Sequence, residues 1–238
     1  MSATLSWGLA ALLLAAGMAY STLRRKLTLP AAGVGGLLGL AIFAGAGWAG
    51  LGILTLFFGL GTGASAWRGA EKRRLDLAEA NRGQRTTGQV LANAGVAAVL
   101  GLVAWRHPAA APLACLMLAG SFAAATADTL SSELGNVYGR RYYNVLTGRP
   151  DTRGENGVIS LEGTLFGLAG NAAVASFYCV CYGWGPAFGW LLVAGTVGNL
   201  LDSLLGAILE RRGLVGNNVV NLLNTLAGAV VVGGLAAL

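Results

Sequence analysis

Two carboxylates stand inside long, largely apolar stretches of the sequence. Asp128 directly follows the uncharged run 121–127, and Asp202 directly follows the uncharged run 197–201. A carboxylate in such surroundings is costly and needs a partner or an ion, so each acid predicts a functional site. The structural alternative for each acid is a salt bridge to a neighbouring arginine.

The residue types around these acids are those that phosphate chemistry uses. Carboxylates favour Mg²⁺ over zinc, so we predict Asp128, Glu133 and Asp202 as the catalytic and metal-binding set. Basic side chains neutralise phosphate, and helix starts bind anions through backbone N–H groups. The predicted substrate- and phosphate-binding residues are Lys72, Arg82, Arg85, Asn93, Arg149, Asn156, Ser160, Ser203, Asn217, Asn218 and Asn221. These parts together indicate phosphoryl or nucleotidyl transfer, although the sequence has neither a P-loop nor the protein-kinase loop set.

An internal repeat explains how two acids distant in sequence could share one site. Residues 127–133 (ADTLSSE) resemble 201–207 (LDSLLGA), and 156–165 align with 217–226. Each copy predicts a helix, a loop and a returning helix, and a third, weaker copy opens its returning helix at 85–93. The copies run parallel, so their equivalent loops converge on one side of the membrane.

The composition indicates how these residues are positioned. Hydrophobic residues make up 55% of the 238 residues and charged ones only 11%, against about 25% charged in a soluble domain. This excludes a soluble enzyme, a disulfide scaffold, a disordered chain and a nucleic-acid binder, and makes the lipid bilayer the surroundings of the protein. We predict an all-α, polytopic helix bundle as a single transmembrane domain, 1–238, with parallel helix-hairpin repeats. Its eight expected spans are about 4–23, 28–45, 48–66, 88–105, 109–127, 162–183, 187–208 and 219–238.

The basic residues orient this bundle. With eight crossings, all of the 16 Lys and Arg residues except Arg106 fall on one side, which the positive-inside rule makes cytoplasmic. All 10 acidic residues lie on or at the same side. We therefore expect an integral membrane protein, in the inner or plasma membrane of a prokaryote, with a cytoplasmic active face and both termini outside.

Several motifs resemble one membrane-protein family. Residues 127–135 (ADTLSSELG), 154–163 (GENGVISLEG), 198–207 (GNLLDSLLGA) and 217–221 (NNVVN) are similar to the family that contains the plastid phytyl-phosphate kinase of tocopherol synthesis. Residues 71–74, 83–85 and 89–93 resemble it too, so the likeness runs from about residue 60 to 238. The segment 151–155 departs from the family pattern.

The resemblance implies a membrane prenyl-phosphate kinase. Such an enzyme transfers a phosphate from a nucleoside triphosphate to a prenyl, phytyl-like monophosphate and forms the diphosphate; the Mg²⁺ cofactor that we expect is predicted from the carboxylates. It also implies kinship with membrane CTP-dependent prenol kinases and CDP-diacylglycerol synthases. Two alternatives remain open: a CTP-dependent prenol kinase or nucleotidyltransferase, and a secondary transporter that uses Asp128 and Asp202 for ions. The sequence leaves the nucleotide, the prenyl chain length and the oligomeric state undetermined.

Overall fold

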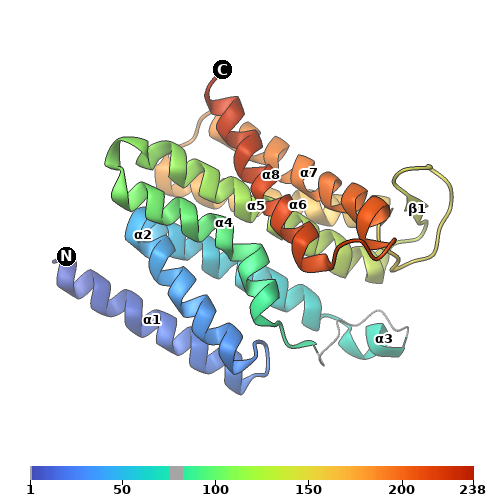
Figure 1. Ribbon diagram of the computed structural model, residues 1–238, viewed down its shortest axis with the longest axis horizontal. Coiled ribbons are helices and arrows are strands. Elements are labelled where there is room, and N and C mark those ends of the chain that lie inside the picture. The colour runs from blue at the N-terminus through green and yellow to red at the C-terminus, as the bar shows by residue number, and fades with distance from the viewer. Residues whose placement is uncertain (1, 75–82) are drawn as a thin grey trace.

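The protein is an all-α, polytopic helix bundle, as predicted. The computed structural model describes residues 2–74 and 83–238, and seven of the helices there are long and apolar enough to cross a membrane. Figure 1 shows them as one bundle. The helices are α1 (Ala3–Leu23), α2 (Leu29–Ala66), α3 (Gly69–Arg74), α4 (Thr87–Arg106), α5 (Ala111–Tyr138), α6 (Leu161–Tyr182), α7 (Ala187–Leu205) and α8 (Asn217–Ala236), with 3-10 helix η2 (Pro108–Ala110) and π-helix η3 (Gly206–Glu210).

Helix α2 folds back on itself at Gly47. A straight helix of its 38 residues would be about 57 Å long, well beyond the roughly 30 Å hydrocarbon core of a bilayer. Gly47 has φ 55° and ψ −144°, which is outside the helical region and is accessible to glycine. Figure 1 shows the two arms of α2 running in opposite directions. The seven long helices of the described residues therefore hold eight membrane-length segments, the expected number.

Helix α5 forms the centre of the bundle. It packs against α2, α4, α6, α7 and α8, and Phe122 in its middle is fully buried. Small residues allow this packing. A Cβ placed on Gly120 of α5 would lie 2.7 Å from the carbonyl oxygen of Gly228 in α8, so the two backbones touch. In contrast, α1 lies at the edge of the bundle against α2 (Figure 1).

Helix α5 also continues well past its expected end at residue 127. It ends only at Tyr138, where Gly139 leaves the helical conformation. The polar residues between 128 and 138 suggested a loop, but no proline interrupts them and many of them face a cavity. Asp128 therefore lies within a helix rather than at the end of one.

The longer connections between the helices lie at one end of the bundle, which we name the polar end. It comprises the connections 24–28, 67–86 (of which 75–82 fall outside the described residues), 139–160 and 211–216. The backbone N–H of Arg85 donates to the Lys26 carbonyl, which joins two of these connections. The connection 139–160 contains a small antiparallel pair, β1 (Tyr143–Asn144) and β2 (Val158–Ile159), with Tyr143 opposite Ile159. Figure 1 shows β1 and α3 at this end, on the right, and the two termini away from it.

Candidate active site

A polar cavity of about 470 Å³ opens at the polar end. Its walls come from the start of α4, the last turns of α5, the end of α7 with η3, the start of α8, and the connection 139–160. Polar side chains outnumber apolar ones on these walls, although most of the walls are formed by four long apolar helices. Such a cavity at the end of a membrane bundle suits a charged ligand that arrives from water.

Asp128 of α5 and Asp202 of α7 lie side by side in this cavity. The hairpins α5–α6 and α7–α8 contribute one acid each to the cavity, and the repeat predicted that the two acids would share one site. The Asp202 Oδ1 atom is buried and has no hydrogen-bond partner among the described residues. Two adjacent carboxylates with an unsatisfied oxygen lack the basic partner that a structural salt bridge would need, within residues 2–74 and 83–238.

Glu133 lines the same cavity but is held by other residues. Its carboxylate forms an ion pair with Lys72, and its Oε1 accepts a 2.7 Å hydrogen bond from Ser65. Lys72 is only 2% exposed and also donates to the Ala64 carbonyl at 2.8 Å, near the end of α2. This network anchors α3 and the end of α2 to α5, and it occupies both oxygens of Glu133.

Arg85 lines the same cavity, just before α4. Its guanidinium lies 5.8 Å from the centre of the Phe57 ring and against Gly61, where an added Cβ would meet Nη2 at 2.8 Å. No carboxylate of the described residues lies within 4.0 Å of it, although its charge acts on Asp128. An arginine that lines a polar cavity without an ion-pair partner can bind an anion through its planar fork.

Helix starts surround the cavity with backbone N–H groups. Thr86 caps α4 in a reciprocal capping box with Gln89, and Ser160 caps α6 by accepting from the Gly163 N–H at 3.1 Å. The start of α8 at Asn217 has no side-chain cap. The Val219 N–H donates to the Gly216 carbonyl at 2.9 Å, while the N–H groups of Asn217 and Asn218 have no side-chain cap, and the positive end of the helix dipole favours an anion there.

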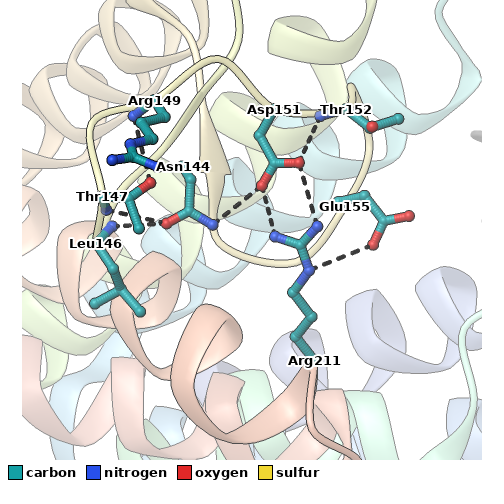
Figure 2. Close-up of polar contacts among 8 residues, drawn as sticks. All are labelled: Asn144, Leu146, Thr147, Arg149, Asp151, Thr152, Glu155 and Arg211. Carbon is teal, nitrogen blue, oxygen red and sulfur yellow. Dashed lines mark hydrogen bonds and ion pairs between the residues drawn. The ribbon is translucent and has the colours of Figure 1, made fainter.

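The connection 139–160 is tied down over the cavity by Arg211. Figure 2 shows the Arg211 guanidinium donating to both oxygens of Asp151, at 2.6 and 3.2 Å. The Asn144 amide donates to the same carboxylate at 3.0 Å (Figure 2). The Arg211 guanidinium, then Asn144 and the Thr152 backbone N–H, hold the pKa of the Asp151 carboxyl well below its usual range. The pair fixes residues 154–160, which line the cavity, against the segment after η3.

Glycine is required where this connection meets η3. Gly157 has φ +77°, and an added Cβ would lie 2.2 Å from the Ala207 side chain. The π-helical turn carries Glu210 into the cavity, within reach of Asn156 and Asn217. Short π-helical turns occur frequently at functional sites because they reposition side chains.

The structure brings together most of the predicted site residues. Those that line the polar cavity are Asp128, Glu133, Asp202, Arg85, Asn93, Asn156, Ser160, Ser203, Asn217 and Asn221. Three described residues lie elsewhere: Lys72 is held by Glu133, Arg149 is exposed on the connection, and Asn218 packs against Gly88. Arg82 lies outside the described residues.

Sequence reasoning missed several residues that line this cavity. On α5, Ser132 and Asn136 follow Asp128 at intervals of four, and Asn199 precedes Asp202 by three on α7. These spacings place side chains on one helical face. The spacing of these polar residues is visible in the sequence, but it indicates a shared helical face only if α5 is known to extend to residue 138. Gln89, between Arg85 and Asn93, follows the same spacing, and further lining residues of this kind are Thr129, Ser131, Tyr142 and Glu210.

The paired acids suit a magnesium ion. Asp128 and Asp202 supply hard oxygen ligands, one of them unsatisfied, and the surrounding donors are amides and hydroxyls. Among the described residues, no three His, Cys, Asp or Glu side chains are grouped closely enough to hold a metal ion. Mg²⁺ commonly uses only one or two protein carboxylates and completes its shell with water and substrate phosphates, so this donor set fits it.

Comparison with known proteins places the chain in a family. The pattern of the integral membrane protein DUF92 family matches residues 11–229. The uncharacterized membrane protein sll0875 of Synechocystis sp. is 33% identical, over 84% of this chain and 79% of its own length. Protein VTE6, chloroplastic, of Arabidopsis thaliana is 31% identical over 82% of this chain, which spans 61% of that protein. Protein PGR of Arabidopsis thaliana is 29% identical, over 88% of this chain and 82% of its own length.

No solved structure matches the chain significantly. The family match covers most of the chain, including the helices that carry the polar cavity, and agrees with seven long apolar helices. The chain therefore belongs to the integral membrane protein DUF92 family, which confirms the family resemblance that its motifs indicated.

Proposed function

We propose that this protein is a membrane prenyl-phosphate kinase. It would transfer the γ-phosphate of a nucleoside triphosphate to a prenyl monophosphate and release a prenyl diphosphate and a nucleoside diphosphate. The observation that carries the proposal is the adjacent, half-buried pair Asp128 and Asp202, which shares with Arg85 a polar cavity at the end of a membrane bundle. The family resemblance to the plastid phytyl-phosphate kinase supports the same reaction.

The cavity offers a distinct place for each phosphate. Arg85 would hold the acceptor phosphate, because its fork matches phosphate oxygens. The open start of α8, with Asn217 and Asn221, would hold the nucleotide phosphates. An acceptor oxygen attacks the γ-phosphorus, and the bond from that phosphorus to the β–γ bridging oxygen breaks. The acceptor is already ionised near neutral pH, so no general base is required.

Asp128 and Asp202 would hold the magnesium ion of this reaction. When bound, the ion neutralises the charge on the transferred phosphoryl group and aligns the phosphates. The connection 139–160 would exclude water, because Asp151 and Arg211 keep it packed against the segment after η3. Exclusion of water prevents hydrolysis of the nucleotide and strengthens the charge interactions inside the cavity.

The polar end would face the cytoplasm, where nucleoside triphosphates are available. Cysteine labelling tests this orientation in a variant whose exposed native Cys181 is replaced by Ser. A membrane-impermeant maleimide should label exposed Thr147→Cys and Arg212→Cys only after the membrane is opened, and Ala109→Cys in intact cells. Labelling of Thr147→Cys from outside would contradict the orientation.

Product analysis tests the reaction itself. Purified protein in lipid nanodiscs is given Mg²⁺, geranylgeranyl monophosphate and ATP, CTP, GTP or UTP in turn. Formation of the prenyl diphosphate with an equal amount of nucleoside diphosphate is expected. Release of pyrophosphate would instead indicate a nucleotidyltransferase, and no product with any nucleotide would refute a kinase for this substrate class.

A further inference from the structure

A second cavity, apolar and also of about 470 Å³, adjoins the polar one. It lies between α1, both arms of α2 and the start of α4, and its walls are mostly leucine, phenylalanine, alanine and glycine. Its volume falls in the range of about 300–1,000 Å³ that is typical of small-molecule sites. Helix α1, which forms one wall of this cavity, is the outermost helix of the bundle and packs mainly against α2 (Figure 1). The cavity therefore lies beside the lipid.

The two cavities meet along one face of α4. Arg85, Gln89 and Asn93 line both of them, at intervals of four residues. Phe57 lines the apolar cavity, and the Arg85 guanidinium lies 5.8 Å from the centre of the Phe57 ring. The cavity of the acid pair and the apolar cavity therefore adjoin at Arg85, a cation without an ion-pair partner among the described residues.

We propose that the apolar cavity binds the hydrocarbon tail of the prenyl monophosphate while Arg85 binds its phosphate. The inference rests on the proposed function and assigns that function its lipid-binding site. An amphiphile with one dianionic head and one apolar chain matches this arrangement of a cation beside an apolar cavity. A two-chain phospholipid would have to place its second chain outside the cavity.

The cavity also sets a length for the tail. On α1 its lining extends from Ser21 at the polar end to Leu13, a rise of about 12 Å along the helix. Leu14, Leu51 and Leu54 close the far end, where they pack against the buried ring of Phe43. Since the floor is packed, the tail length that fits between it and Arg85 is limited.

Two glycines of the cavity wall can carry an added side chain without a clash at its Cβ atom. Gly35 and Gly59 line the cavity on opposite arms of α2. A Cβ on Gly59 would meet nothing within 4 Å, and one on Gly35 would meet only Val90 at an ordinary 3.8 Å. Gly33 and Gly63 have equally open surroundings but do not line the cavity, so they are matched controls.

Turnover of prenyl monophosphates of different length tests the site. Gly35→Leu and Gly59→Leu should raise the KM for geranylgeranyl monophosphate by about 10-fold or more, because added methylenes occupy the space of the tail. The KM for dimethylallyl monophosphate, whose tail needs only the part beside Arg85, should not change. Gly33→Leu and Gly63→Leu should leave both values unchanged. Equal KM values for the long substrate in all four variants would overturn the inference.

Photolabelling supplies a readout that does not depend on turnover. Geranylgeranyl monophosphate with a diazirine on its terminal isoprene unit should label α1 and α2 near Leu14 and Leu54. Excess unlabelled substrate should prevent this labelling. Labels confined to α6, α7 or α8 would overturn the tail site even if kinase activity is present. Labelling without any phosphate transfer would instead support the tail site and refute the kinase.

A phospholipid with a diazirine in its acyl chain separates the two possible sources of a hydrocarbon tail. The inference expects that excess prenyl monophosphate displaces this probe from the residues near Leu54. Labelling there that persists unchanged under excess prenyl monophosphate would assign the cavity to bilayer lipid and overturn the inference.

Discussion

Arg211 reaches from the segment after η3 to Asp151 in the connection 139–160 and donates to both carboxylate oxygens, at 2.6 and 3.2 Å (Figure 2). These residues are 60 positions apart in the chain. The pair links the two α-hairpin repeats outside the membrane helices, and residues 154–160 beside it form a wall of the polar cavity. The ion pair therefore contributes to the order of that wall.

Asp151→Asn should loosen the connection. Because the folded-state pKa of Asp151 is lowered, its stabilisation is complete above the ordinary pKa of about 3.9 and is lost as the pH falls through the lower folded value. Amide hydrogen exchange of residues 144–158 should be slow in the wild type throughout pH 4–7, as a rough window, and faster in Asp151→Asn. Glu155→Gln, whose carboxylate lies 3.9 Å from Arg211 Nε, is the control. Equal exchange in both variants would show that the pair does not hold the connection.

Asp128→Asn and Asp202→Asn should each abolish phosphate transfer without lowering stability. A carboxamide keeps the shape of the side chain but is a poor Mg²⁺ ligand, and the change removes repulsion between adjacent acids. Turnover, the thermal unfolding midpoint and Mn²⁺ binding followed by electron paramagnetic resonance should be measured together. Glu162→Gln, the same chemical change outside the cavity, should retain all three. Normal metal binding and turnover in either Asp variant would remove that residue from the site.

Breaking the pair of Lys72 and Glu133 should affect folding first. Lys72 is 2% exposed, so removing either partner leaves a buried charge without compensation, at about 3–5 kcal/mol of unfolding free energy. Denaturant unfolding in detergent should show this loss in Lys72→Met and in Glu133→Gln. The double variant should recover part of it. If Glu133→Gln instead keeps full stability and strongly reduces the affinity for Mg²⁺, Glu133 is a metal ligand.

Arg85→Lys should lower kcat/KM for the prenyl monophosphate by about 10-fold or more. Lysine keeps the charge but loses the planar fork, and charge-assisted hydrogen bonds contribute about 1.5–3 kcal/mol. Arg140→Lys is chemically the same change at an exposed position outside the cavity, and it should leave kcat/KM unchanged. Equal losses of kcat/KM in Arg85→Lys and Arg140→Lys would mean that a residue of another connection binds the phosphate.

Much of the fold could be predicted because the membrane imposes it. Uncharged runs of fixed length and the distribution of arginines defined eight crossings, and the boundary between the expected spans 28–45 and 48–66 falls at the reversal in helix α2. The end of α5 could not be predicted in the same way. Polarity marks where a helix leaves lipid, but here Ser132 and Asn136 stay helical because they face a polar cavity instead of lipid.

The site residues that belong to the internal repeat could be predicted from the sequence. Those whose role depends on a contact between residues distant in the sequence could not. The repeat aligned Asp128 with Asp202, and the structure places them side by side. Nothing in the local sequence indicates that Lys72 pairs with Glu133, because the pairing depends on how α3 returns to α5. For the same reason, acid type alone could not distinguish the anchored Glu133 from the unsatisfied Asp202.

Arg85 lines both the polar and the apolar cavity, and this has a consequence for kinetics. A ligand held there keeps its head at the membrane surface and its tail in hydrocarbon, so it never has to dissolve in water. The effective substrate concentration is then two-dimensional, a mole fraction in the bilayer. Diluting the prenyl phosphate with inert lipid should slow the enzyme even when the amount per volume is constant.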